Sequence, residues 1–188
     1  MKTRCKWAKA DSLSKLYHDT EWGVPQHDDR LLFEHIILDG LQAGLSWSII
    51  LQKRENIKSA FDNFDPVVIA GYKIQKIEEL LADKGVIRNR GKVEAVVQNA
   101  QAFLNIQKEF KSFDGYIWQF VKRKPVQNSW KTPKEIPTQT KESIAMSRDL
   151  KRRGFKFVGP VMCYAFMQAV GMVNDHTIDC FRYREVQQ

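Results

Sequence analysis

The sequence predicts an all-α protein, and three observations support this. Apolar residues recur at intervals of three and four along most of the chain, whereas the alternation typical of half-buried strands is nowhere sustained. Glycine and proline, with 10 and 6 copies in 188 residues, are too few for a turn-rich all-β chain. Hydrophobic residues make up 43% of the chain, enough for a real core, so we expect one folded domain spanning residues 1–188.

The first predicted helices follow one another closely. The segment 28–40 has its apolar residues on one side and an aspartate at its start, and Gly40 is expected to end it. A short break at 41–44 separates it from a helical pattern over 45–61. Asp65-Pro66 is then typical of the N-cap and first position of another short helix.

The rest of the chain keeps the helical period. Further helical or apolar segments cover 73–83, 93–106, 113–121, 142–154 and 160–171. Between the first two of these lies a basic, glycine-containing turn at 83–92. The polar stretch 122–140 contains three prolines and is predicted to be a connector.

The charge of the chain favours polyanionic partners. It has 30 Lys and Arg against 22 Asp and Glu, a formal charge of +8, which is compatible with nucleic-acid binding. No apolar run approaches the ~18 residues of a membrane helix, and the N-terminal segment lacks the apolar stretch of a secretory signal. We therefore expect no membrane association, a cytoplasmic location and, by default, a monomer.

Two Cys–His pairs near the chain ends indicate a metal site. Three cysteines in a chain without an export signal favour reduced thiols or a metal over disulfides. Cys5 and His18 lie 13 positions apart, and His176 and Cys180 lie four apart. Two thiolates and two imidazoles would close a tetrahedral shell around one structural zinc and join the two ends. Spacing alone leaves open a buried thiol beside unrelated histidines, and Cys163 is expected to be a plain core residue.

A second group of candidates lies in the first quarter of the chain. It holds four large aromatic residues: Trp7, Tyr17, Trp22 and Trp47. For each one alone, core packing is the simpler interpretation. Asp39 ends an apolar helical segment, where the helix dipole disfavours a carboxylate, and this indicates a second purpose for its side chain. The segment 42–45 is a short loop with an exposed leucine, and a plain turn is the alternative.

The sequence resembles the 3-methyladenine DNA glycosylase I family in five stretches: LYHDTEWGVP, LDGLQAGLSW, LQKREN, RGFKFVG and VNDHTIDC. The resemblance runs from Cys5 to Cys180. It implies the all-α helix-hairpin-helix glycosylase fold, with the hairpin region around 73–105. It also implies one structural zinc held by two Cys and two His, here Cys5, His18, His176 and Cys180. The implied activity is removal of 3-methyladenine from alkylated double-stranded DNA, with the free base as product.

The resemblance also implies roles in a base-binding pocket. Tyr17 and Trp47 would stack on the flipped base, and Trp7 and Trp22 would help to line the pocket. The family has a glutamate that hydrogen-bonds the lesion, and this chain has Asp39 there, shorter by one methylene or ~1.5 Å. Three residues of the following loop would contact DNA: Gln42, beside the opposite strand, Gly44, and Leu45, which would fill the gap left by the flipped base.

The chemistry of such a lesion suits these residue types. A duplex base must leave the stack before an enzyme reaches its glycosidic bond, and an apolar wedge such as Leu45 can replace the lost stacking. Methylation at N3 makes the base cationic and activates it as a leaving group, so no strong general acid is required. Electron-rich faces of Tyr17 and Trp47 attract a cation. Asp39, the candidate catalytic residue, would add a negative charge or an acceptor.

Basic residues near the predicted turn are candidates for phosphate contacts. Arg88, Arg90 and Lys92 lie where backbone amides and a helix N-terminus could also hold a phosphate. The cluster of Lys151, Arg152, Arg153 and Lys156 is a weaker candidate, because helix C-termini favour cations for their own reasons.

Two activities remain open at this point. No amine lies in a matching motif, so we expect a monofunctional glycosylase rather than a lyase. The alternative is a non-catalytic protein that binds alkylated DNA on the same scaffold, because Asp39 replaces the family glutamate.

Overall fold

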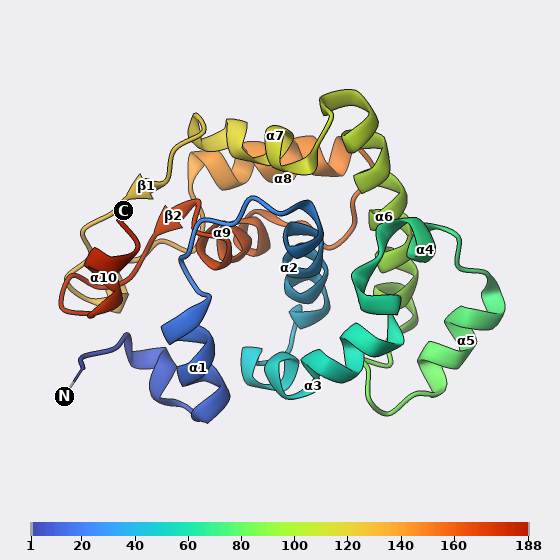
Figure 1. Ribbon diagram of the computed structural model, residues 1–188, viewed down its shortest axis with the longest axis horizontal. Helices are drawn as coiled ribbons and strands as arrows, with labels where there is room; N and C mark the ends of the chain where they lie inside the picture. The colour runs from blue at the N-terminus through green and yellow to red at the C-terminus, as the bar shows by residue number, and fades with distance from the viewer. Residues whose placement is uncertain (1, 188) are drawn as a thin grey trace.

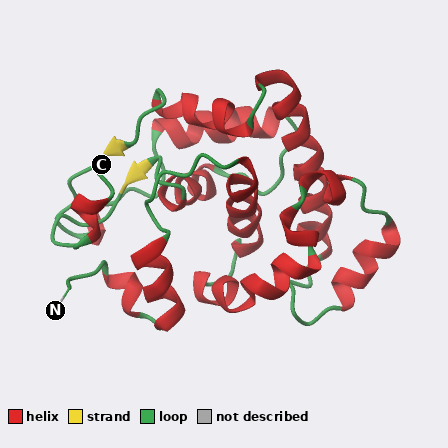
Figure 2. Ribbon diagram, in the orientation of Figure 1, coloured by secondary structure: helices red, strands yellow, loops and turns green. Residues whose placement is uncertain are grey.

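The structure, a computed structural model that describes residues 2–187, is mostly helical with very little strand, as predicted (Figure 2). Its only strands in that range are β1 (Val126–Gln127) and β2 (Val173–Asn174), which pair in parallel. The α-helices are α1 (Ser12–Thr20), α2 (Asp29–Gln42), α3 (Trp47–Ala60), α4 (Pro66–Ala70), α5 (Ile74–Ala82), α6 (Arg90–Phe110), α7 (Phe113–Ile117), α8 (Lys141–Arg152), α9 (Pro160–Ala169) and α10 (Arg182–Glu185). Four 3-10 turns join them: η1 (Lys6–Lys9), η2 (Asp62–Phe64), η3 (Trp118–Val121) and η4 (Pro133–Glu135).

Helix α2 is the centre of the fold (Figure 1). It packs against α3, α6, α7 and α9. Every residue from Leu32 to Leu41 is buried, so this helix is enclosed on all sides rather than along one apolar stripe. The polar side chains that it carries, including His35 and Asp39, are therefore buried too.

Both ends of α2 are held by charged side chains. At its start, the Asp29 carboxylate accepts hydrogen bonds from the backbone N–H groups of Phe113 at 2.8 Å and Asp114 at 2.7 Å. At its end, Lys92 Nζ donates to the carbonyl oxygens of Leu41 at 2.8 Å and Ala43 at 2.6 Å. A helix C-terminus leaves carbonyl groups without partners and favours a nearby cation, so Lys92 stabilises this end. These contacts at its two ends thus fix the position of α2 along its axis.

The prediction that Gly40 ends this helix was wrong. α2 continues to Gln42, because Lys92 satisfies carbonyl groups at its end. A Cβ added at Gly40 would make only an ordinary van der Waals contact, 3.7 Å from Phe157 Cβ, so packing does not require glycine there. The glycine that adopts a left-handed backbone conformation after this helix is Gly44, with φ of +78°.

Most other predicted helices are confirmed, with shifted ends. α6 begins at Arg90 rather than Val93, because Asn89 caps it by accepting from the backbone N–H of Lys92 at 3.1 Å. The segment 113–121 is divided between α7 and η3. Helix α1 was not predicted; Asp11 caps it by accepting from the backbone N–H of Ser14 at 2.8 Å.

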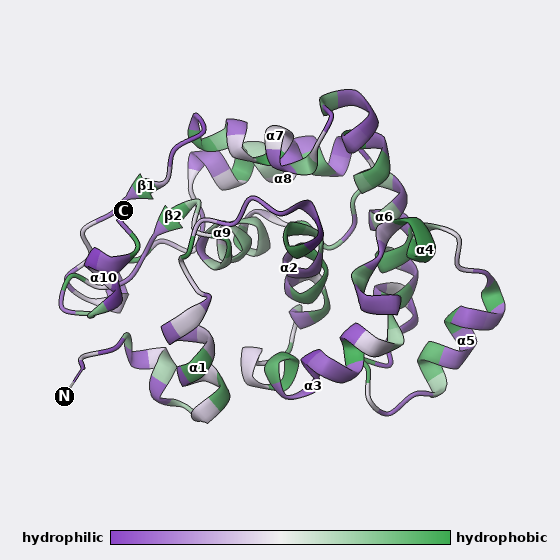
Figure 3. Cartoon of the chain, in the orientation of Figure 1, coloured by the Kyte–Doolittle hydropathy of each residue, from purple (hydrophilic) through white to green (hydrophobic). Residues whose placement is uncertain are grey.

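Hydropathy follows burial along the chain. In Figure 3, α9 is mostly hydrophobic, whereas α6 and α8 carry hydrophilic and hydrophobic residues in turn, as expected of helices with one solvent-facing side. Within residues 2–187, no helix is both long enough and apolar enough to cross a membrane.

Among the glycines of residues 2–187, Gly171, just after α9, leaves the least room for a Cβ. Its φ is +69°, and an added Cβ would lie 2.4 Å from the backbone of Val24 and of Pro25. We expect Gly171→Ala to lower the free energy of unfolding by about 3 kcal/mol or more, because it adds both a clash and left-handed strain. Gly159→Ala is the control, since nothing lies within 4 Å of that position. It should change stability by about 1 kcal/mol at most. Urea unfolding followed by circular dichroism measures both, and equal stabilities would contradict this packing.

Candidate functional site

A cavity of about 260 Å³ opens between α1, α2, α3 and α9. Nine residues line it: Trp7, Tyr17, Trp22, Asp39, Gln42, Trp47, Ala165, Gln168 and Ala169. The structure thus brings all four candidate aromatic residues together with Asp39 and Gln42. The sequence analysis placed α9 only in the core and missed its three lining residues. The volume is below that of pockets for drug-sized ligands and suits one small flat ring system.

The aromatic side chains form the walls of this cavity. Tyr17 and Trp47 have ring centroids 5.3 Å apart and planes tilted by 49°. Trp7 meets Tyr17 at 6.2 Å and Trp22 edge-on at 5.0 Å. Tyr17 and Trp22 are buried, whereas Trp7 is 37% exposed. Such a concentration of π-systems offers stacking and attraction for a planar cation.

Polar contacts between α1 and α3 hold this arrangement. The Asp11 side chain caps α1 through the backbone N–H of Ser14 and also accepts a hydrogen bond from the Ser48 hydroxyl in the first turn of α3. One carboxylate therefore joins the starts of both helices. This contact helps to keep Tyr17 of α1 against Trp47 of α3.

Asp39 is a buried acid in the last turn of α2. It is 4% exposed, and burial raises the pKa of its carboxyl group to about 8. The negative end of the helix disfavours the charged form further. Near neutral pH the group is therefore mostly protonated. Its neighbours carry no charge to oppose this, because burial lowers the pKa of His35 to about 3 and raises that of Tyr17 well above its usual value.

Two buried polar atoms of the cavity residues lack hydrogen-bond partners. They are Asp39 Oδ2, an acceptor when ionised, and Trp47 Nε1, a donor. Buried polar atoms in native proteins are nearly always paired. An unpaired acceptor and donor beside one cavity are what a ligand with a polar edge requires.

The loop after α2 carries an exposed apolar side chain beside the cavity. Leu45 is 36% exposed, and its backbone N–H donates to the Gln42 carbonyl at 2.7 Å. Gly44 allows this tight turn with its positive φ, and nothing lies within 4 Å of its Cβ position. Leu45 is therefore presented at the tip of a short, hydrogen-bonded loop.

The three basic candidates of the turn lie in different surroundings. Arg88 and Arg90 are exposed, and Arg90 forms ion pairs with Glu78 at 2.8 Å and Glu94 at 3.6 Å. Lys92 is 7% exposed and turns inward, onto the carbonyl groups at the end of α2. Its side chain supports the loop that carries Leu45 and is not presented on the surface.

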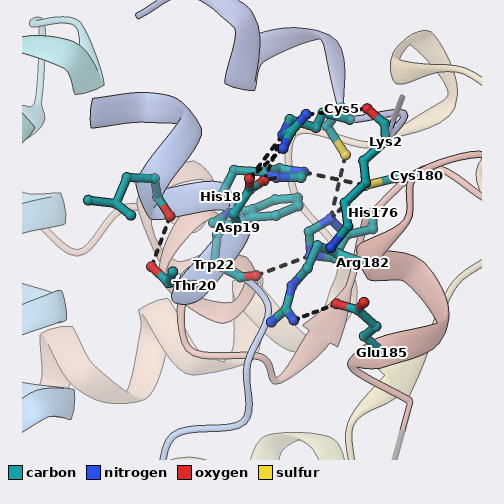
Figure 4. Close-up of polar contacts among 12 residues, drawn as sticks. Lys2, Cys5, His18, Asp19, Thr20, Trp22, His176, Cys180, Arg182 and Glu185 are labelled. Carbon is teal, nitrogen blue, oxygen red and sulfur yellow. Dashed lines mark hydrogen bonds and ion pairs between the residues drawn. The ribbon is translucent and has the colours of Figure 1, made fainter. Parts of the chain in front are cut away.

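The two Cys–His pairs form one buried cluster (Figure 4). Ligand atoms of Cys5, His18, His176 and Cys180 all lie within 4.8 Å of one another. Cys180 Sγ lies 3.4 Å from His18 Nε2 and 3.5 Å from His176 Nδ1, and Cys5 Sγ lies 3.6 Å from His176 Nδ1. In a tetrahedral site with ordinary metal–sulfur and metal–nitrogen bonds, such atoms are roughly 3.6 Å apart. The cluster could hold a metal ion.

The outer nitrogens of both histidines are also hydrogen-bonded. His18 Nδ1 meets Asp19 Oδ1 at 2.8 Å, and the Arg4 guanidinium lowers the pKa of Asp19 to about 2. His176 Nε2 meets the carbonyl oxygen of Trp22 at 3.1 Å. Such contacts orient histidine ligands in metal sites. Because the Trp22 indole lines the cavity, this last bond also connects the cluster to the cavity wall.

These features define an all-helical protein with an aromatic cavity of base size, a buried acid in it, and a metal-compatible cluster that joins the chain ends. Comparison with known proteins agrees. Residues 7–183 match the methyladenine glycosylase family model. The chain is 48% identical to DNA-3-methyladenine glycosylase 1 of Escherichia coli K12, with 96% of each chain covered. It is 47% identical to a DNA-3-methyladenine glycosylase of Haemophilus influenzae, covering 96% of this chain and 97% of that one.

Solved structures show the same fold. A crystal structure of 3-methyladenine DNA glycosylase I matches with a TM-score of 0.93 and 48% identity, over 95% of this chain and 98% of that one. A structure of the Staphylococcus aureus glycosylase, solved to explain 3-methyladenine recognition, matches with a TM-score of 0.92 and 35% identity over 95% of both chains. This chain belongs to the methyladenine glycosylase family.

The cluster leads to a prediction about metal content. Elemental analysis of the purified protein should find one metal ion per chain, and Cys180→Ala should lose it. The matched control is Cys163→Ala, since Cys163 is buried outside the cluster and should retain the metal. A chelator should lower the melting temperature of the parent protein and of the control, because a metal bound only by the folded state stabilises it. An unchanged melting temperature after metal removal would contradict the role of the cluster in joining the chain ends.

Proposed function

We propose that this protein hydrolyses the N-glycosidic bond of 3-methyladenine in alkylated double-stranded DNA and releases the free base. The observation that carries the proposal is the buried, unpaired carboxyl group of Asp39 in an aromatic cavity large enough for one base. The names of the relatives support it, as do the S. aureus structure solved to explain 3-methyladenine recognition and a similar glycosylase structure in complex with 3-methyladenine.

Recognition of the lesion would combine the aromatic walls with the two unpaired polar atoms. Tyr17 and Trp47, whose ring centroids lie 5.3 Å apart, would each present a face to the base as neighbouring walls, and Trp7 and Trp22 would complete the wall. Both kinds of base can stack on these faces, but only a cationic base gains the additional cation–π attraction. Asp39 Oδ2 would bind a polar atom on the base edge, and Trp47 Nε1, which lies in the plane of the stacking indole, would donate to a polar atom of the same nucleotide outside the base.

Asp39 would also contribute to the chemistry. Without a charged ligand beside it, its carboxyl group is mostly neutral at pH 7, because burial disfavours the charge. A cationic base reverses this preference, since an opposite charge nearby stabilises the carboxylate. The carboxylate would then stabilise the positive charge that develops on the sugar as the bond to the activated base breaks. The cavity is lined by aromatic, carboxyl, amide and alanine side chains, which suits a monofunctional glycosylase.

Access to the base requires that it leave the duplex. Leu45, exposed at the tip of its loop, would enter the gap and replace the lost stacking. Gln42 and Gly44 of the same segment would contact the surrounding DNA. Lys92 would act indirectly, by holding the carbonyl group of Ala43 at the base of this loop.

The protein would also bind the sugar–phosphate backbone of the duplex. Helix α5, the turn at 83–89 and helix α6 would form the helix-hairpin-helix element, with Arg88 and Arg90 directed at phosphates. Arg90 would have to exchange its ion pairs with Glu78 and Glu94 for a phosphate. We propose a monomer, because one chain supplies every residue of the cavity. As a DNA-repair enzyme with bacterial relatives, it would act in the cytoplasm.

We propose zinc as the ion in the cluster. Two thiolates and two imidazoles at these distances match tetrahedral zinc, and four protein ligands leave no open position. Zinc would therefore stabilise the fold. It would hold the N-terminal segment with Trp7 against the C-terminal segment.

The direct test measures free bases released from methylated duplex DNA by chromatography. The parent protein should release 3-methyladenine. Asp39→Asn should reduce the single-turnover rate by on the order of tenfold or more, because it removes the negative charge. Asp39→Glu is the matched control and should retain activity. Tight binding of alkylated DNA without base release would instead support the non-catalytic alternative.

The pH dependence follows from the raised pKa of Asp39. The ionised fraction grows as pH rises toward and past about 8, so kcat/KM for the cationic lesion should rise through that range. The Asn variant should show no such rise, since its amide does not titrate. A parent profile that is flat between pH 6 and 9 would contradict an active carboxylate with a raised pKa.

A further inference from the structure

Gln168, in the last turn of α9, is the polar residue that this helix contributes to the aromatic cavity. The other two lining residues of α9 are Ala165 and Ala169, whose side chains form no hydrogen bonds. An amide that is only partly exposed requires partners for both its nitrogen and its oxygen. These partners decide whether Gln168 can recognise a bound base.

A buried carboxylate binds the nitrogen of this amide. Gln168 Nε2 donates to Asp175 Oδ2 at 2.7 Å, and Asp175 is 1% exposed. The Tyr164 hydroxyl also donates to Oδ2 at 2.7 Å. The other oxygen, Oδ1, accepts from Asn128 Nδ2 and from Trp130 Nε1, each at 2.7 Å. Four donors therefore occupy the lone-pair sites of the Asp175 carboxylate.

This network determines which way the Gln168 amide faces. An amide can turn by 180°, which exchanges its oxygen and nitrogen, and its hydrogen-bond partners decide between the two orientations. If the oxygen faced Asp175, two acceptors would meet in the protein interior, which is unfavourable. The nitrogen therefore faces Asp175, and the oxygen faces away from it. The backbone is held as well, because the Gln168 carbonyl oxygen accepts from the N–H of Gly23 at 3.1 Å.

The side-chain oxygen of Gln168 remains accessible. Oε1 forms no hydrogen bond within residues 2–187, and it is not one of the fully buried unpaired atoms of that range. Because Gln168 lines the cavity, this acceptor is available to a ligand there. The cavity residues thus offer two acceptors without partners, Asp39 Oδ2 and Gln168 Oε1.

Two acceptors match the donor group of the lesion. In DNA, the only N–H bonds of 3-methyladenine are the two of its exocyclic amino group. 3-Methylguanine has a carbonyl oxygen at the same ring position, and that oxygen would meet an acceptor instead of donating to it. A site built to bind a donor strongly rejects an analogue that lacks it, because the polar groups of the site are then left unpaired.

We propose that Gln168 is a specificity-determining residue whose Oε1 accepts a hydrogen bond from the exocyclic amino group of the bound base, and that Asp175 is the positioning residue that keeps this oxygen turned toward the base. This role of Gln168 rests on the proposed function and deepens it. Charge alone does not separate 3-methyladenine from 3-methylguanine, since methylation at N3 makes both bases cationic in DNA. The Gln168 amide supplies the difference.

The first test measures dissociation constants of free 3-methyladenine and free 3-methylguanine by quenching of tryptophan fluorescence. Gln168→Met keeps the length of the side chain and removes both polar groups. It should weaken 3-methyladenine binding about five- to tenfold, because one hydrogen bond inside the cavity is lost, and it should not weaken 3-methylguanine binding. Gln101→Met is the matched control and should bind both bases as the parent does. Gln101 Nε2 also donates to a carbonyl oxygen, that of Ala70 at 3.0 Å, but lies outside the cavity.

The second test addresses the positioning role. Asp175→Asn can present an N–H to Gln168 and so allow the Gln168 amide to turn. The ratio of 3-methyladenine to 3-methylguanine released from methylated duplex DNA should therefore fall, as it should in Gln168→Met. A loss of stability alone would slow the release of both bases equally and leave the ratio unchanged. Gln168→Met leaves the buried carboxylate in place and keeps the proposal testable if Asp175→Asn does not fold.

Each outcome has a distinct meaning. An unchanged ratio of the two affinities in Gln168→Met would overturn the role of Gln168, as would an equal loss for both bases or a parent protein that binds both equally. A folded Asp175→Asn protein with the parent ratio would overturn the positioning role. A parent protein that releases no 3-methyladenine from methylated duplex DNA would overturn the proposed function itself.

Discussion

The burial of Asp39 is the constraint on which the site depends. Its carboxyl group lies in the last turn of a helix that is enclosed on all sides, where apolar surroundings and the helix dipole both disfavour its charge. In the proposed function, a neutral base would meet a mostly neutral acid there, whereas a cationic base would stabilise the ionised carboxylate. Discrimination between damaged and normal bases can arise from this single electrostatic difference, with the aromatic walls adding to it. Because the Asp39 side chain is short, its reach into the cavity depends closely on the placement of α2.

The remaining structure keeps that helix and its surroundings in position. Asp29 and Lys92 hold the two ends of α2, and Asp11 joins the helices that carry Tyr17 and Trp47. The Cys–His cluster holds the chain ends and, through the carbonyl oxygen of Trp22, one wall of the cavity. Each of these contacts joins segments far apart in the sequence, and each acts on the cavity or on the loop beside it. The stability of the fold and the geometry of the site therefore depend on the same interactions.

The sequence predicted the helices whose core face shows a clear period, and it missed α1, whose buried residues serve the site. Helix α1 has exposed leucines and buries Tyr17 and His18, so it has no ordinary apolar stripe. The extension of α2 past Gly40 and the inward turn of Lys92 arise from one long-range contact that local patterns do not contain. Motifs identified the cavity residues on α1, α2 and α3. Gln168 on α9 could be identified as a cavity residue only from the structure, in which α9 packs beside those helices. Spacing alone also could not establish the metal cluster, because its two Cys–His pairs lie at opposite ends of the sequence and come together only in the folded chain.

The central claim concerns the protonation state of one carboxyl group, and carbon-13 NMR of Asp39 measures it directly. A titration of the selectively labelled protein, assigned with Asp39→Asn, should give a pKa of about 8 without ligand. Addition of a cationic methylated purine should lower that pKa by at least one unit, because the bound cation stabilises the carboxylate. A pKa near the ordinary value of about 4 that the ligand leaves unchanged would contradict the account.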